Sequence, residues 1–325
     1  MSRTATPERL DLTAVTRRLV HLPKDPPPSG PGVPEPDEER FALAGELPHG
    51  PSLFGDGAGG HDTQLFVEIF RQLGLSLGYR YFRVPAERAC LFVGLDWAVA
   101  DPAGWRGRGA GACLAMDVRA TPTTKSVTGV PRGLRLAGTL SIDGAPGCAG
   151  SAEVLFLPPT VARGHRATSR LAAVSGDAPR PSSPARPLAD PGAVGRTDPG
   201  DVVVSAPVTR GEASTTAIVV DPGHPVFFMD GADSVPGLLL VEALRQSAVL
   251  AAGRSHGFHP AETALTAMAV RFRGFAELDL PLSCTAVAGP VRRDAAGRPS
   301  APIRLTVSQL GKVTAEAEIT AARAA

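Results

Sequence analysis

The chain has 325 residues and nearly balanced charge, with 33 basic and 32 acidic side chains. This length is comfortable for two domains of ordinary size. The balance lacks the basic excess typical of proteins that bind nucleic acid or an anionic membrane surface, so neither partner is expected. No stretch is long and apolar enough to cross a bilayer, and the N-terminus lacks the apolar segment of a signal peptide. A cytoplasmic protein is predicted.

The first half is predicted to be one helix with a sheet, after a surface loop. Seven prolines and two glycines exclude regular structure from Pro23–Pro36. The apolar patterns that follow predict a helix over about 62–79. Strands are predicted over 40–46, 89–98, 113–120, 134–142 and 151–157.

The second half repeats this order. A strand over 214–220 precedes a helix over 234–254, and strands follow over 266–272, 283–288, 303–309 and 314–320. Between the halves, Ser175–Gly200 holds six prolines among Ser, Ala, Arg and Gly, a composition that cannot order itself alone. We therefore expect units at 1–160 and 200–325, joined by a linker at 161–199.

The four cysteines, Cys90, Cys113, Cys148 and Cys284, are scattered along the chain without CxxC spacing. This arrangement supports neither a zinc site nor a disulfide framework. We expect buried thiols.

One phrase occurs twice: VEIFRQ at Val67–Gln72 and VEALRQ at Val241–Gln246. Glu68, Arg71 and Gln72 thus recur as Glu242, Arg245 and Gln246, which indicates an internal duplication. Around the second copy the helix is apolar nearly all the way round, the pattern of an enclosed helix.

The three polar side chains Glu242, Arg245 and Gln246 lie on one face of that helix, and a buried charge is costly unless it is paired. A single occurrence would be most simply a structural ion pair. Two occurrences, each with the same glutamine, favour a functional site.

The start of the second helix also suggests chemistry. Asp233 or Ser234 can cap it, and Pro236 is tolerated in a first turn whose amide protons are unpaired. Gly237 would let a ligand carbonyl approach the backbone, and the helix dipole favours negative charge there. Alternatively, proline and glycine only shape the turn.

The segment D-S-V-P-G-L-L-L-V-E-A-L-R-Q at Asp233–Gln246 resembles the central-helix signature of hotdog-fold acyl-thioester enzymes. With its doubled E-x-x-R-Q, the chain is most similar to the A-factor biosynthesis type, the γ-butyrolactone signal synthases. The resemblance implies an α+β tandem (double) hotdog fold, in which each curved antiparallel sheet wraps one long buried helix. It also implies transfer of a β-ketoacyl group from acyl carrier protein to the hydroxyl of dihydroxyacetone phosphate, and no redox or metal cofactor.

Within this resemblance, Glu68 and Glu242 are candidate general bases, and apolar surroundings would raise the pKa of each. Arg245 and Arg71 suit either phosphate recognition or pairing with the neighbouring glutamate. Gln72 and Gln246 would position the carbonyl or the helix partner. We expect the halves to lie face to face, with pockets lined by both units and a tunnel for the acyl chain between the sheets.

The chain departs from the family pattern at several histidines. Ser234 stands where members commonly have histidine, and His224 lies farther upstream than a hotdog dehydratase requires, which makes dehydration less expected. In the first half, His61 and Asp62 could form an oriented base. Alternatively, Asp62 is the helix N-cap and His61 a solvated neighbour.

Two other readings of the function stay open. The chain could be a different hotdog acyl-thioester enzyme, either a thioesterase or a dehydratase. It could also be a degenerate module that binds acyl groups or carrier protein without catalysis. Either a monomeric pseudo-dimer or a homodimer fits the duplication.

Overall fold

A computed structural model describes residues 19–22, 38–46, 62, 64–99, 102, 112–125, 129–175, 186–228 and 232–323. The predicted loop Pro23–Pro36 and the candidate residue His61 lie outside these ranges.

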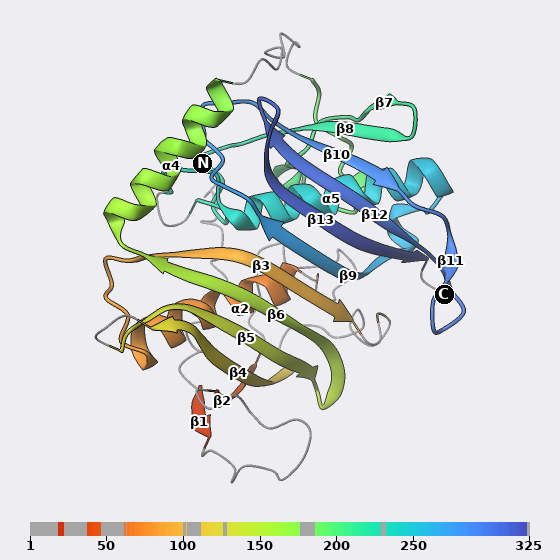
Figure 1. The fold of residues 1–325 in the computed structure, drawn as a ribbon. Helices are drawn as coiled ribbons and strands as arrows, with labels where there is room; N and C mark the ends of the chain where they lie inside the picture. The colour runs from red at the N-terminus through yellow and green to blue at the C-terminus, as the bar shows by residue number, and fades with distance from the viewer. Residues whose placement is uncertain are drawn as a thin grey trace, which may run out of the picture.

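The described strands form one 13-stranded antiparallel sheet (Figure 1). The first half contributes β1 (Val20–Leu22), β2 (Glu39–Glu46), β3 (Ala89–Val99), β4 (Cys113–Lys125), β5 (Pro131–Ile142) and β6 (Ala145–Leu157). The second contributes β7 (Val208–Arg210), β8 (Ala213–Ile218), β9 (Thr263–Phe272), β10 (Leu282–Ala288), β11 (Arg292–Arg293), β12 (Pro299–Gln309) and β13 (Lys312–Arg323). Every strand predicted from the sequence overlaps one of these. The short strands β1, β7 and β11 were not predicted.

The strand order shows the duplication. It runs β2-β4-β5-β6-β3 in the first half and then β9-β13-β12-β10-β8 in the second, so the halves mirror each other about the β3–β9 junction. There Gly94 pairs with Arg271 and Ala98 with Ala267. The halves therefore join edge to edge through backbone hydrogen bonds, and the expected face-to-face packing of two sheets is wrong. The reason is that each inner edge strand can satisfy its backbone groups by pairing with the other.

Each half packs one long helix against its part of the sheet (Figure 1). Helix α2 (Gln64–Ser76) continues into a π-helical turn, η2 (Leu77–Tyr81), and contacts β3, β5 and β6. Helix α5 (Gly237–His256) contacts β8, β9, β10, β12 and β13. Most of α5 is buried, as its apolar pattern predicts. The helices also contact each other, and Gln64 at the start of α2 donates a hydrogen bond to Glu242 in the second copy of the phrase.

The segment predicted as a linker holds regular structure. Helix α4 (Pro159–Val174) occupies its first part, and Arg166 and Arg170 on this helix pair with Glu277 and Asp279 of the second half. Farther on, the 3-10 turns η3 (Gly192–Val194) and η4 (Pro199–Asp201) lead into the second half. The linker prediction missed α4 because the apolar face of this helix is short and its composition blends into the proline-rich stretch. The boundaries at 160 and 200 stay a prediction.

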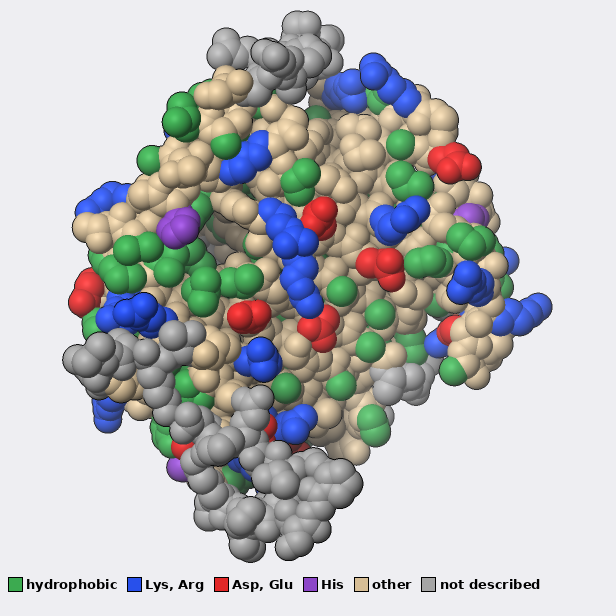
Figure 2. Space-filling view, viewed as in Figure 1, with side chains coloured by type: hydrophobic (Ala, Val, Ile, Leu, Met, Phe, Trp, Pro, Cys, Tyr) green, Lys and Arg blue, Asp and Glu red, His purple; other side chains and the backbone are tan. Residues whose placement is uncertain are grey.

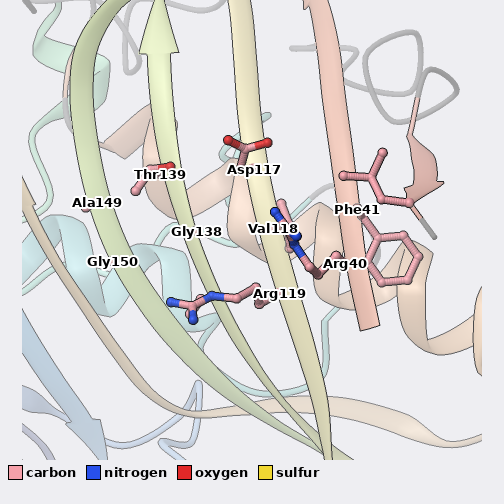
Figure 3. Close-up of a pocket in the computed structure, with 11 residues that line it drawn as sticks. Arg40, Phe41, Asp117, Val118, Arg119, Gly138, Thr139, Ala149 and Gly150 are labelled. Carbon is pink, nitrogen blue, oxygen red and sulfur yellow. The ribbon is translucent and has the colours of Figure 1, made fainter. Parts of the chain in front are cut away.

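The face of the first-half sheet that lies away from α2 carries a small pocket of about 260 Å³ (Figure 3). Its floor is glycine backbone, at Gly138 and Gly150, and its charged side chains have both signs, with Asp117 near Arg119 and Arg40.

Candidate active site

Glu242 is the centre of a buried ionic network on α5. Arg196 donates to both carboxylate oxygens, from Nε to Oε1 at 2.9 Å and from Nη2 to Oε2 at 2.7 Å. Arg245 Nη2 donates to Oε1 at 2.9 Å. Gln246 Nε2 donates to Oε1 at 2.6 Å, and Gln64 Nε2 donates to Oε2 at 2.8 Å. Glu242 is fully buried, so this carboxylate is enclosed by protein donors.

The two arginines decide the protonation state of Glu242. Burial alone would raise the pKa of this carboxyl, but Arg196 and Arg245 outweigh burial and hold the pKa well below its ordinary value. The expected rise in the pKa of Glu242 is therefore wrong. The expectation counted the apolar helix and omitted Arg196. A carboxylate held this firmly as the anion is a poor proton acceptor.

This network joins the two halves of the chain. Gln64 is the first residue of α2, and its backbone N–H donates to the Asp62 carboxylate at 2.9 Å, which caps that helix. The same carboxylate lies 3.2 Å from Arg196 Nη1 and 4.0 Å from Arg245 Nη1. Asp62 and Glu242 thus share two arginines across the interface between α2 and α5.

The segment before β7 closes over this face of α5. Arg245 Nη2 donates to the Val194 carbonyl at 2.9 Å. Gln246 donates to the Asp201 carbonyl at 2.7 Å and accepts from the Val203 N–H at 3.0 Å. Arg245 and Gln246 therefore hold backbone in place, and Arg245 also forms with Glu242 the ion pair that was considered as the structural alternative.

In the first copy of the phrase, Glu68 is bound by two side chains of its own helix. Arg71 donates to Glu68 through Nε at 2.7 Å and through Nη2 at 2.8 Å, and Gln72 Nε2 donates at 2.9 Å. The Glu68 side chain is 2% exposed, whereas that of Arg71 is 27% exposed. This fork of donors holds the guanidinium at a fixed angle. The polar face of the first copy reaches an accessible surface through Arg71, whereas Glu242, Arg245 and Gln246 of the second copy are buried.

That surface is the wall of a cavity of about 770 Å³ between the halves. Its walls include Val67 and Arg71 of α2, residues 90–93 and 95 of β3 and the first turn of α5. One side of α4 covers it. Most of the lining is apolar. In the space-filling view the molecule is hollowed beside α4, with apolar and basic side chains at the edge of the hollow (Figure 2). Such a cavity suits an acyl chain with a polar end.

The start of α5 borders this cavity at Gly237. Pro236 is the N-cap residue and makes no side-chain cap, so the expected capping by Asp233 or Ser234 is not found. Asp233 instead pairs with Arg166 of α4, and its side chain is 85% exposed. The first amides of α5 therefore keep the orientation that favours an anion or a polarised carbonyl at the cavity wall.

His224 has a structural role in a turn of the second half. Its Nδ1 accepts from the N–H groups of Val226 and Phe227, and its ring packs on the Phe227 ring at 4.3 Å. Burial lowers the pKa of this imidazole, against the opposing effect of Asp201. Val226 and Phe227 line the cavity, but His224 does not.

The structure thus separates the predicted site residues into groups. Arg71 and Gly237 line the cavity, and Glu68 and Gln72 stand directly behind Arg71. The enclosed network contains Asp62, Glu242, Arg245 and Gln246. The sequence analysis missed seven polar residues at these places: Gln64, His165, Thr168, Ser169, Arg196, Arg273 and Lys312.

The cysteines differ in exposure, and this difference predicts their reactivity. Cys90 lines the cavity, but burial raises the pKa of its thiol to about 12, so it is not a nucleophile near neutral pH. Cys284 and Cys148 are buried, and Cys113 is exposed, contrary to the expectation of buried thiols throughout. We expect iodoacetamide at about pH 8 to label Cys113 alone, as measured by peptide mass mapping. The unfolded chain should react at all four, and fast labelling of Cys90 would contradict the prediction.

The sequence of this chain is similar to those of known proteins. The sequence model of the A-factor biosynthesis hotdog domain matches residues 177–324. A Streptomyces coelicolor protein named 2-oxo-3-(phosphooxy)propyl 3-oxoalkanoate synthase is 31% identical over 78% of this chain and 75% of its own. A Streptomyces griseus protein of the same name is 30% identical over 88% of each chain. The chain belongs to the A-factor biosynthesis hotdog family. The resemblance drawn from the doubled phrase is therefore confirmed.

The fold of this A-factor biosynthesis family member is also found in solved structures. The crystal structure of a protein described as an oleoyl thioesterase from Lactobacillus plantarum matches 89% of this chain and 98% of its own, with a TM-score of 0.51 and 9% identity. At that identity the match concerns the fold alone, and it confirms the predicted hotdog architecture. Within the described ranges, no helix has the length and apolar character needed to cross a membrane.

Proposed function

We propose that this chain is an acyltransferase that moves a β-ketoacyl group from the thioester of an acyl carrier protein to the hydroxyl of dihydroxyacetone phosphate. The hydroxyl oxygen attacks the thioester carbonyl, the C–O bond forms and the C–S bond breaks. The hydroxyl proton leaves with the thiol. Support comes from one observation: a cavity with apolar walls places Arg71, backed by Glu68, and the first turn of α5 around the same space.

Each part of this cavity suits one part of the reaction. The apolar walls hold the acyl chain, and the α5 amides at Gly237 and Leu238 stabilise negative charge on the thioester oxygen. Arg71 orients the acceptor, and Glu68 behind it receives the proton of the acceptor hydroxyl. Glu242 and Arg245 join the halves, because both are enclosed by the network with Arg196. The chain therefore has one reaction centre, in the cavity beside Arg71.

Mass spectrometry of a reaction mixture tests this function. The purified full chain is incubated with β-ketoacyl carrier protein of several chain lengths, with and without dihydroxyacetone phosphate. The expected product is the acylated phosphate ester or its butenolide, which is lighter by one water, and only when the acceptor is present. Free β-keto acid released at the same rate without acceptor would indicate a thioesterase. An intact thioester in every mixture would indicate a binding module.

Substitution of Gly237 tests the role of the α5 start. A Cβ there would meet only the Phe272 ring, at 3.6 Å, so alanine fits, but its methyl lies on the cavity wall. We expect Gly237→Ala to fold normally and to lower kcat/KM roughly 10- to 100-fold by displacing the thioester. Gly164→Ala on α4, where a Cβ meets nothing within 4 Å, is the control. Equal steady-state rates for the two variants would refute this placement.

A further inference from the structure

The ionic side chains that line the cavity are basic. The basic side chains that line it, within the described ranges, are Arg71, His165, Arg273 and Lys312, and no carboxylate is among the lining residues. The chain as a whole is nearly neutral. The cavity therefore attracts anions, and three of these four side chains lie away from α2, where α4 meets the second half.

The side chain of Lys312 is held in a fixed position where α4 meets the second half. Its Nζ donates to the Ser169 carbonyl at 3.1 Å and also contacts the Ser169 hydroxyl. Gly274 leaves the space for this contact, because a Cβ there would stand 3.2 Å from Nζ and 2.9 Å from the Ser169 Oγ. Ser169 is buried. The ammonium group is therefore fixed between α4 and the loop after β9.

The direct hydrogen-bond partners of Lys312 that the structure describes carry no negative charge. Its hydrogen bonds within the described ranges go to a carbonyl and a hydroxyl, which are neutral. Burial lowers the pKa of this amine, with Glu277 opposing the effect. Glu277 itself is bound by Arg166 and Arg170 of α4. An anion arriving from the cavity would stabilise the ammonium group.

This position adjoins the start of α5. The Ser169 hydroxyl donates to the Phe275 carbonyl at 3.2 Å, and the Ala276 carbonyl accepts from the Val235 N–H at 2.9 Å. The loop 273–276 is thus fastened on one side to α4 and on the other to the residue before Pro236. An anion beside Lys312 would lie at the same cavity wall as the thioester carbonyl.

We infer that Lys312, with His165 and Arg273 at the rim, forms a subsite for the phosphate ester of a substrate. A phosphate ester offers up to two negative charges and several acceptor oxygens, which suits several N–H donors better than a carboxylate would. Arg273 also pairs with Glu316 at 2.7 Å, so Lys312 makes the principal contact. The subsite rests on the proposed function for the occupant, which is either the triose phosphate acceptor or the phosphopantetheine arm of the carrier protein.

Phosphate binding tests the subsite without turnover. Isothermal titration with glycerol 3-phosphate is run on the wild type, Lys312→Met, Lys312→Arg and the control Arg292→Met on exposed β11. We expect Lys312→Met to weaken binding about 10- to 100-fold, Lys312→Arg to restore most of it and the control to match the wild type. His165→Gln, on the exposed side of α4, gives a second variant that does not disturb the core and should weaken binding about threefold. Unchanged affinity in both Lys312→Met and His165→Gln would overturn the subsite.

Steady-state kinetics then identifies the occupant. If the acceptor phosphate binds there, Lys312→Met raises KM for dihydroxyacetone phosphate and leaves KM for the carrier protein unchanged. If the arm binds there, the variant loses the preference for β-ketoacyl-pantetheine 4′-phosphate over β-ketoacyl-pantetheine. If Lys312→Met forms product with neither a raised KM nor a lost preference for the 4′-phosphate, the subsite is refuted and the proposed function stands. Loss of phosphate binding in Lys312→Met, when the wild type forms no product, leaves the subsite standing and refutes the function.

Discussion

Replacing Glu242 by glutamine lowers the free energy of unfolding by roughly 3–5 kcal/mol, because two buried guanidinium groups lose their shared counter-charge. Arg196 and Arg245 are 1% and 6% exposed at the side chain, so water cannot take over the role of the carboxylate. Urea denaturation at neutral pH measures the loss.

Glu68→Gln is the matched control for this prediction. The partner of Glu68 is Arg71, whose side chain is 27% exposed and can be hydrated from the cavity. The loss of stability should therefore be smaller, about 1–2 kcal/mol. Equal losses at the two positions would show that the difference in enclosure has no energetic effect.

The network also predicts how stability depends on pH. The pKa of Glu242 in the folded chain lies below its ordinary value of 4.5, so the folded state binds fewer protons than the unfolded state in acid. The stabilisation by Glu242 is fully present above that value and is lost as the pH falls towards the folded-state pKa. The stability difference between wild type and Glu242→Gln should be constant from about pH 6 to 8 and should narrow below about pH 4.5.

Replacing Arg71 by methionine lowers kcat/KM for acyl transfer roughly 10²- to 10³-fold, the usual cost of losing one placed donor near developing charge. Arg71→Lys should recover little of this loss. A lysine keeps the charge but cannot form the two parallel bonds to Glu68 that fix the guanidinium angle. Steady-state assays with β-ketoacyl carrier protein and dihydroxyacetone phosphate make the comparison.

Arg80→Met is the control for this series, because Arg80 is an exposed arginine at the end of the same helical segment and does not line the cavity. Thermal melting accompanies the kinetics, since Arg71→Met removes the counter-charge of buried Glu68. If Arg71→Met, when fully folded, keeps more than about a third of wild-type kcat/KM, Arg71 does not contact the reacting groups.

The sequence predicted the elements that carry strong periodic patterns. Helix α5 was predicted because its apolar residues surround it, and the succession of helix and strands along the chain was predicted because each half repeats the other. The edge-to-edge joining at β3 and β9 was not predicted. Alternation along a strand indicates which face is buried, but it does not indicate which strand edge finds a partner.

The candidate site was predicted in part for a similar reason. The repeated phrase identified Glu68 and Glu242 as equivalent in sequence, but their surroundings come from segments that lack the repeat. Arg196 lies in the proline-rich stretch, 46 residues from its partner. One local signal was present in the sequence, the glycine directly before Arg196; in the structure Gly195 adopts φ of 66°, a turn conformation that favours glycine. Lys312 could not be linked to α4 without the tertiary structure.

The β3–β9 junction has a consequence for how the chain can be divided. The pairing from Gly94–Arg271 to Ala98–Ala267 covers the inner edge of both sheets. Expressing either half alone would expose a long row of unpaired backbone N–H and C=O groups, which readily recruits another strand. A separated half should therefore self-associate through this edge, whereas in the intact chain the covalent link keeps the two inner strands close enough to pair with each other.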